Sequence, residues 1–125
     1  MKEIVSTPNA PAAIGPYSQA TIYNGIVYCS GQVALHPETM QVVGEDVTTQ
    51  AKQVMNNLKA VLEKAGSDFS KVLKCSIFLD SMDDFAAVNE VYGGYFQENP
   101  PARETVAVQT LPKNVLVEVS CIAYI

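Results

Sequence analysis

The spacing of hydrophobic residues predicts an early β-hairpin. Short, mostly apolar runs at 17–23 and 26–33 are typical of strands. Between them, Asn24 and Gly25 are residue types that accept positive φ, which predicts a tight type I′ turn. Gly31 interrupts the second run and predicts either a bulge or a point where another group comes close to the backbone.

Two later segments have the three- and four-residue spacing of amphipathic helices. The first runs from 48 to 64 and ends at Gly66, a residue type common just after helices. Ser81, with an acid three residues later, predicts the N-cap of a second helix whose apolar residues extend over 85–96. Each helix has one apolar stripe, so both are expected to pack on a shared core.

Alternating residues predict three more strands, at 73–79, 105–109 and 115–124. The last strand has one clearly apolar face, which we assign to the core. Its second face is also largely apolar and consists of Leu116, Glu118, Ser120, Ile122 and Tyr124. These elements predict an α+β fold, a mixed β-sheet with two helices packed on one face. No segment remains to cover the other face, so we expect a homo-oligomer that packs these faces together.

In the strand at 105–109, we assign Val106 and Val108 to the core face. Alternation then places Arg103 and Thr105 on the opposite face. This expectation brings Arg103 to the same side of the sheet as Glu118, in or beside the subunit interface.

Composition narrows the class of protein. The 125 residues fit one domain, 1–125, and no apolar run is long enough to span a membrane. A net charge of −5 argues against a nucleic-acid partner, because binding a phosphate backbone favours clustered basic residues. The amino terminus lacks the continuous apolar core of a secretory signal, so we expect a cytoplasmic protein.

The sequence carries no recognisable cofactor or metal motif. Cys29, Cys75 and Cys121 have no C-x-x-C spacing, and each lies in an apolar run, which predicts buried free thiols. His36 is the only histidine. Phosphate-binding, dinucleotide-binding and nucleophile-elbow motifs are absent, so we expect chemistry without a cofactor or metal.

Two charged residues stand out as candidates for chemistry. Arg103 is the only arginine, and guanidinium binds a carboxylate through two parallel hydrogen bonds in a way that lysine does not. Its alternative is an ordinary solvated or salt-bridged arginine. Glu118 lies within an apolar strand, which suggests either a general acid/base with a raised pKa or a structural pair with a lysine or backbone amide. Tyr17 and Ser30 are weaker candidates as hydrogen-bond donors.

Several short motifs together resemble the Rid family, the reactive intermediate deaminases of YjgF type. The resemblance runs over nearly the full length in the order Gly15-Pro16-Tyr17-Ser18-Gln19, Ser30-Gly31-Gln32, Pro101-Ala102-Arg103, Leu111-Pro112-Lys113 and Val117-Glu118. It implies a chorismate-mutase-like fold, a homotrimer whose open sheet faces form a central barrel, and ligand sites between subunits. It also implies hydrolysis of enamine and imine forms of amino acids, such as 2-aminoacrylate, 2-iminopropanoate and 2-iminobutanoate, to 2-keto acids and ammonia.

The resemblance also implies roles for particular residues. Arg103 is similar to the carboxylate clamp of the family, and Glu118 to the residue that positions or activates water. Tyr17, Ser30, Gly31 and the Thr105 backbone are similar to the surrounding substrate-binding wall.

The chain departs from the family pattern at Glu104, where a small residue is common. Alternation is expected to turn Glu104 away from the site. Thr105 stands where some relatives have cysteine. Two other functions remain open, a non-catalytic 2-keto acid binder and an RNA-directed endoribonuclease or translation inhibitor. The presence of Glu118 beside Arg103 favours the enzyme, and the acidic charge argues against RNA.

Overall fold

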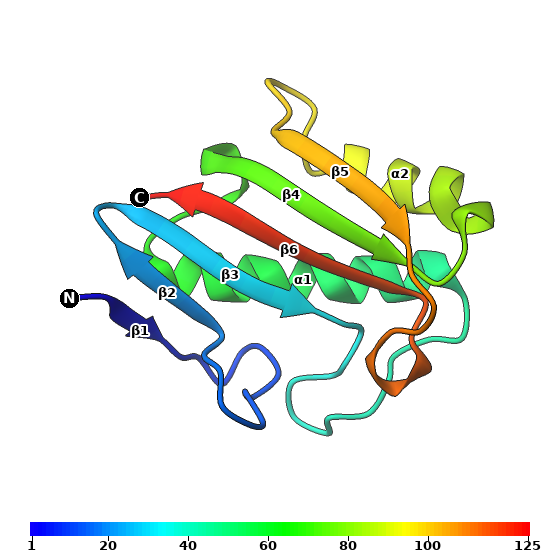
Figure 1. The fold of residues 1–125 in the computed structure, drawn as a ribbon, viewed down its shortest axis with the longest axis horizontal. Coiled ribbons are helices and arrows are strands. Elements are labelled where there is room, and N and C mark those ends of the chain that lie inside the picture. Colours follow the sequence, from blue (N-terminus) through cyan, green and yellow to red (C-terminus); the bar gives the residue numbers. More distant parts are fainter.

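The computed structural model describes residues 1–125 and consists of a six-stranded sheet with two helices on one face (Figure 1). The strands are β1 (Glu3–Val5), β2 (Ala20–Tyr23), β3 (Ile26–Gln32), β4 (Val72–Leu79), β5 (Ala102–Ala107) and β6 (Val117–Tyr124), and the helices are α1 (Val47–Ala65) and α2 (Phe85–Gly93). The sheet order is β1-β2-β3-β6-β4-β5. Only β4 and β5 are parallel, so the predicted mixed sheet with two helices is confirmed.

The β2–β3 hairpin has the turn that its sequence predicts. Asn24 and Gly25 have φ values of 50° and 76°, which are the positive values of a type I′ turn. The register between β3 and β6 shifts between Cys29 and Gln32, so the bulge expected around Gly31 is confirmed. The sequence pattern did not predict β1, whose three residues are too few for an alternation signal.

Helix α1 lies behind the central strands and contributes most of the helical share of the core (Figure 1). The Asp46 side chain caps its first turn by accepting a hydrogen bond from the Thr49 N–H at 2.9 Å. Gly66 ends it in the left-handed conformation, with φ 87°. Helix α2 ends at Gly93, three residues before the predicted end at Phe96. Neither helix combines the length and hydrophobicity that crossing a bilayer requires.

The three cysteines form a row across the buried face of the sheet. Cys121 of β6 pairs in register with Cys29 of β3 on one side and with Cys75 of β4 on the other. All three are buried and free, as the sequence predicts. Burial raises the pKa of the Cys75 thiol to about 11, so this thiol stays protonated at neutral pH.

The faces of β5 are the reverse of those predicted. Arg103 and Thr105 are in register with the core residues Cys75 and Ile77, so their side chains lie on the helix-covered face. Val106 instead lies on the open face and is 44% exposed. The prediction failed because β5 is an edge strand beside α2, where an arginine can bury its apolar stem while its charged end stays exposed. Val106 lies on the face that no helix covers.

The loop before β2 is held by one buried side chain. Gln19 is only 3% exposed, and its amide accepts a hydrogen bond from the Thr7 N–H at 2.6 Å. The same amide donates to the carbonyl oxygens of Thr7, Ala10 and Pro11. One side chain thus satisfies four backbone groups that no strand or helix pairs.

Replacing Gln19 with leucine is therefore expected to lower the free energy of unfolding by about 2–4 kcal/mol, because buried backbone groups lose their partners. The urea midpoint should fall with little change in slope. Gln97→Leu is the matched control, since its only bond is an exposed one to the Gly94 carbonyl. A Gln19→Leu midpoint equal to that of Gln97→Leu would contradict this account.

Candidate active site

A cavity of about 450 Å³ opens where the bulged end of β3 meets β6 and the loop before β2. Four of the residues predicted from sequence line it: Tyr17, Ser30, Gly31 and Glu118. Ser30 is fixed there, because its hydroxyl donates to the Ser18 carbonyl oxygen at 2.6 Å. The bulge brings the backbone of Gly31 against the Glu118 side chain, and a Cβ at position 31 would overlap the Glu118 carboxylate. A glycine is thus needed here for the acid to occupy its place.

Glu118 is half-buried and has no partner within the chain. It takes part in neither of the two ion pairs, and no side-chain hydrogen bond involves it. Burial alone raises the pKa of its carboxyl above the usual range. The structural alternative, in which a lysine or a backbone amide pairs with the Glu118 carboxylate, is therefore wrong for this chain. An unpaired acid with a raised pKa in a cavity is a typical acid/base candidate.

Arg103 lies against α2, on the other face of the sheet. Its guanidinium carbon is 5.0 Å from the centre of the Tyr92 ring and 5.6 Å from that of Phe85. One terminal nitrogen, Nη1, donates to the Asn89 side-chain oxygen at 2.7 Å. A second cavity, of about 410 Å³, is lined by Arg103 together with Tyr92, Phe96 and the two prolines at 100–101.

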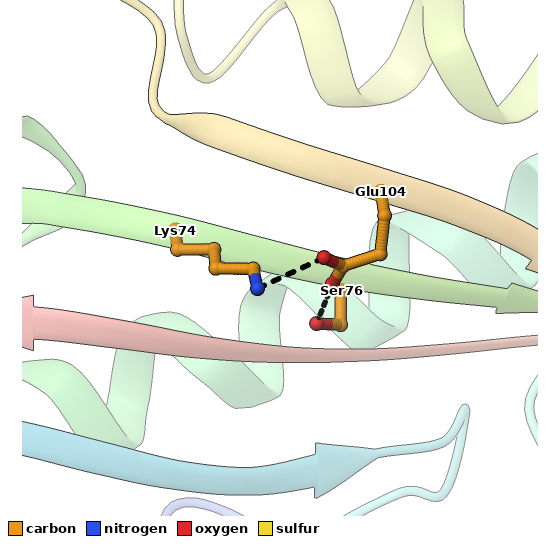
Figure 2. Close-up of polar contacts among 3 residues, drawn as sticks. All are labelled: Lys74, Ser76 and Glu104. Carbon is orange, nitrogen blue, oxygen red and sulfur yellow. Dashed lines mark hydrogen bonds and ion pairs between the residues drawn. The ribbon is translucent and has the colours of Figure 1, made fainter.

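Glu104 points away from Arg103, as strand alternation predicts. Figure 2 shows its carboxylate on the open face of the sheet, between Lys74 and Ser76. The Lys74 ammonium lies 2.9 Å from Oε1, and the Ser76 hydroxyl donates to Oε2. These contacts, with the Ser76 hydrogen bond the larger cause, lower the pKa of the Glu104 carboxyl, so it stays ionised without reaching the arginine.

Arg103 and Glu118 do not meet within one chain. Glu118 is in register with Phe78 on the open face, whereas Arg103 is in register with Cys75 on the helix face. The two cavities that contain them share no lining residue. Thr105 lies on the Arg103 side, and its buried hydroxyl has no hydrogen-bond partner. The expectation that Arg103 and Glu118 share one face is wrong for a single chain, because it rested on the reversed faces of β5.

Two residues of these cavities were given no role by the sequence. Lys113 lines the Glu118 cavity and has φ 57°, an unusual value for lysine. It is part of the Leu111-Pro112-Lys113 motif, but a single lysine in a loop does not by itself indicate a functional role. Asn89 binds Arg103 from α2, fourteen residues away in sequence. Only its helical spacing with Phe85 and Tyr92, four and three residues away, would have indicated the contact.

The fold and the two cavities around Glu118 and Arg103 define an α+β protein with ligand-sized sites beside a mixed sheet. The chain belongs to the Rid (YjgF) family, because the family model described as endoribonuclease L-PSP matches residues 7–125.

Known relatives are similar over almost the whole chain. A RutC family protein from Synechocystis is 52% identical over 123 residues, which cover 97% of this chain and 95% of the relative. The 2-iminobutanoate/2-iminopropanoate deaminase of Mus musculus is 46% identical over 123 residues, covering 98% and 91%. The crystal structure of RidA from an Antarctic Psychrobacter superimposes with a TM-score of 0.94 at 43% identity, covering 98% of this chain and 99% of that one. The resemblance found in the sequence is thereby confirmed.

Proposed function

We propose that this protein is a cytoplasmic deaminase of reactive imines and enamines. It would convert 2-iminopropanoate, the tautomer of 2-aminoacrylate, and 2-iminobutanoate with one water to the 2-keto acid and ammonia. The observation that carries the proposal is the unpaired, half-buried Glu118 carboxylate beside Gly31 in a ligand-sized cavity. The deaminase name of the Mus musculus relative supports the same activity.

The reaction needs no strong nucleophile from the protein, because an iminium carbon is already electrophilic. Glu118 would accept a proton from water as the water oxygen bonds to that carbon. It would then return the proton to nitrogen and take the hydroxyl proton of the carbinolamine, so that the keto carbonyl forms as the carbon–nitrogen bond breaks and ammonia leaves. The guanidinium of Arg103 would hold the substrate carboxylate, so that much of the rate comes from proximity and orientation. No cofactor is needed for any of these steps.

Such a site requires two copies of the chain. Since Arg103 and Glu118 lie on opposite faces, a substrate of six or seven heavy atoms reaches both only if Arg103 comes from a neighbouring subunit. The open face is suited to such contacts, since it exposes Tyr28, Val106 and Tyr124 at 49%, 44% and 42%. We therefore propose a homotrimer with three shared sites, in which the open faces form the interior of a barrel.

Subunit mixing tests the activity and the shared site together. Arg103→Ala and Glu118→Ala are each expected to be inactive in keto-acid release from 2-iminopropanoate generated in place by a dehydratase. Unfolding and refolding the two variants in equal amounts should restore about one quarter of wild-type activity, because each residue reaches a given interface with a chance of about one half. Refolding each variant alone is the control. No recovery on mixing would contradict the shared site, and an inactive wild type would contradict the deaminase function.

The RNA-directed alternative suggested by the family description has little support in this chain. The net charge is −5, and among residues lining the Glu118 cavity only Lys113 is a cation. Binding a phosphate backbone favours several clustered cations. A 2-keto acid carrier without turnover would keep Arg103 but would have no need of Glu118.

A further inference from the structure

Helix α2 holds the Arg103 side chain through two kinds of contact, with aromatic rings and through a hydrogen bond. Phe85, Asn89 and Tyr92 recur at four and three residues and so form one stripe of the helix. The two aromatic rings lie against the guanidinium, at 5.6 Å and 5.0 Å from its central carbon. The Asn89 side-chain oxygen, 2.7 Å from Nη1, fixes the rotation of the guanidinium against these rings.

These contacts leave most of the guanidinium free for a ligand. A guanidinium has five N–H donors, and Asn89 accepts from one nitrogen only. The contacts with the two rings occupy none of these hydrogen-bond donors. The contacts therefore orient Arg103 without occupying the N–H pair that a carboxylate needs for bidentate binding.

The surroundings also leave the positive charge of Arg103 uncompensated. Neither ion pair of the chain involves it, and the cavity around it contains no acid. The neighbouring acid, Glu104, is turned to the other face, where Lys74 and Ser76 bind it (Figure 2). The one hydrogen-bond acceptor on Arg103 is thus a neutral amide oxygen, which orients the guanidinium and keeps its charge available.

We propose that Asn89 is a positioning residue, whose neutral side-chain oxygen pre-orients Arg103 for the substrate carboxylate. The inference rests on the proposed deaminase function and adds a requirement to it. The residue at position 89 must accept a hydrogen bond and must also be uncharged. Alanine fails the first condition and aspartate the second, so the two variants separate orientation from charge.

The single arginine makes the contact directly observable. In a nitrogen-15 correlation spectrum, the Nε–H signal of Arg103 is the only one of its kind. Asn89→Ala is expected to move and sharpen this signal as the side chain gains freedom. Asn56, an exposed asparagine of α1, is the matched control, and Asn56→Ala should leave the signal in place. An unchanged signal in Asn89→Ala would overturn the proposal.

Binding and turnover then test the two conditions. Pyruvate, a product of the proposed reaction, is the probe. Asn89→Ala should weaken its binding about three- to tenfold, through the cost of ordering a freed side chain. Asn89→Asp should weaken it at least about tenfold, since an internal carboxylate competes for the guanidinium. In turnover, both variants should raise KM with kcat within about twofold of wild type, whereas Asn56→Ala and Asn56→Asp match wild type.

The outcomes are distinguishable from failure of the proposed function. Wild-type pyruvate affinity in Asn89→Ala would overturn the positioning role, and equal affinity in Asn89→Ala and Asn89→Asp would overturn the requirement for a neutral side chain. A wild type that releases no keto acid would contradict the deaminase function, while the arginine spectrum and pyruvate affinity would still decide the role of Asn89. If wild type did not bind pyruvate at all, the inference would fall.

Discussion

Arg103→Lys is expected to lower kcat/KM for 2-iminopropanoate about 10²–10³-fold, although the positive charge is retained. Lysine replaces two parallel hydrogen bonds by a point charge, and two charge-assisted bonds contribute about 3–4 kcal/mol to transition-state binding. Lysine also lacks the planar guanidinium that lies over the Tyr92 ring, where its central carbon is 5.0 Å from the ring centre. Most of the loss should appear in KM, because the carboxylate is bound equally in the ground and transition states.

Steady-state rates of keto-acid release, with the imine produced by a coupled oxidase, measure this effect. Lys59→Ala is the control for a lost surface cation, because its pair with Glu63 is long, at 3.9 Å, and exposed. An Arg103→Lys variant as active as wild type would contradict bidentate carboxylate binding by Arg103, because lysine keeps the charge but not the parallel pair of N–H donors.

Glu118→Gln is expected to lower kcat about 10²–10⁴-fold while making the folded protein more stable at neutral pH. Glutamine keeps the shape of the side chain but cannot accept the proton from water. It also removes the unpaired buried charge. Loss of activity with gain of stability is the signature of a functional acid, and a merely structural acid would lose both.

The pH dependence of the wild type should run in opposite directions for activity and stability. Burial raises the pKa of Glu118 in the folded chain above its unfolded value. Its contribution to stability is therefore fully present below the unfolded pKa and is lost as pH rises through the folded pKa. Activity, which needs the ionised base, should rise over the same interval.

Urea unfolding at fixed protein concentration, on both sides of this interval, measures the difference between wild type and Glu118→Gln. The two should have similar midpoints at the acidic end, and the variant should be more stable at the neutral end. Glu63→Gln, an exposed acid on α1, is the control and should show no such divergence. A Glu118→Gln variant that is less stable than wild type at neutral pH would contradict an unpaired carboxylate.

Much of the fold could be predicted because local sequence and global structure agree. Asn24-Gly25 specifies its turn by positive φ, and Gly66 specifies the end of α1 in the same way. Gly31 indicated a bulge before any partner for it was known. Each of these signals depends on a residue whose backbone preference differs sharply from that of its neighbours.

The relation between Arg103 and Glu118 could not be predicted from one chain. Alternation along β5 correctly separates Arg103 from Glu104, but it does not say which set faces the helices. Hydrophobicity gave the wrong answer there, since Val106 lies on the open face and the arginine packs on Tyr92. The resemblance implied sites between subunits, which is the arrangement that the opposite faces of these two residues favour.

The place of β6 in the sheet has a consequence for how the chain folds during synthesis. This strand comes last along the chain, yet it lies between β3 and β4 and pairs with both. Until residues 117–124 leave the ribosome, the β1–β2–β3 part and the β4–β5 part have no strand pairing with each other. Their core faces stay exposed meanwhile, and closing the sheet joins segments distant in sequence, which is slow. Chaperone binding to nascent chains should therefore persist until residues 117–124 have emerged from the ribosome.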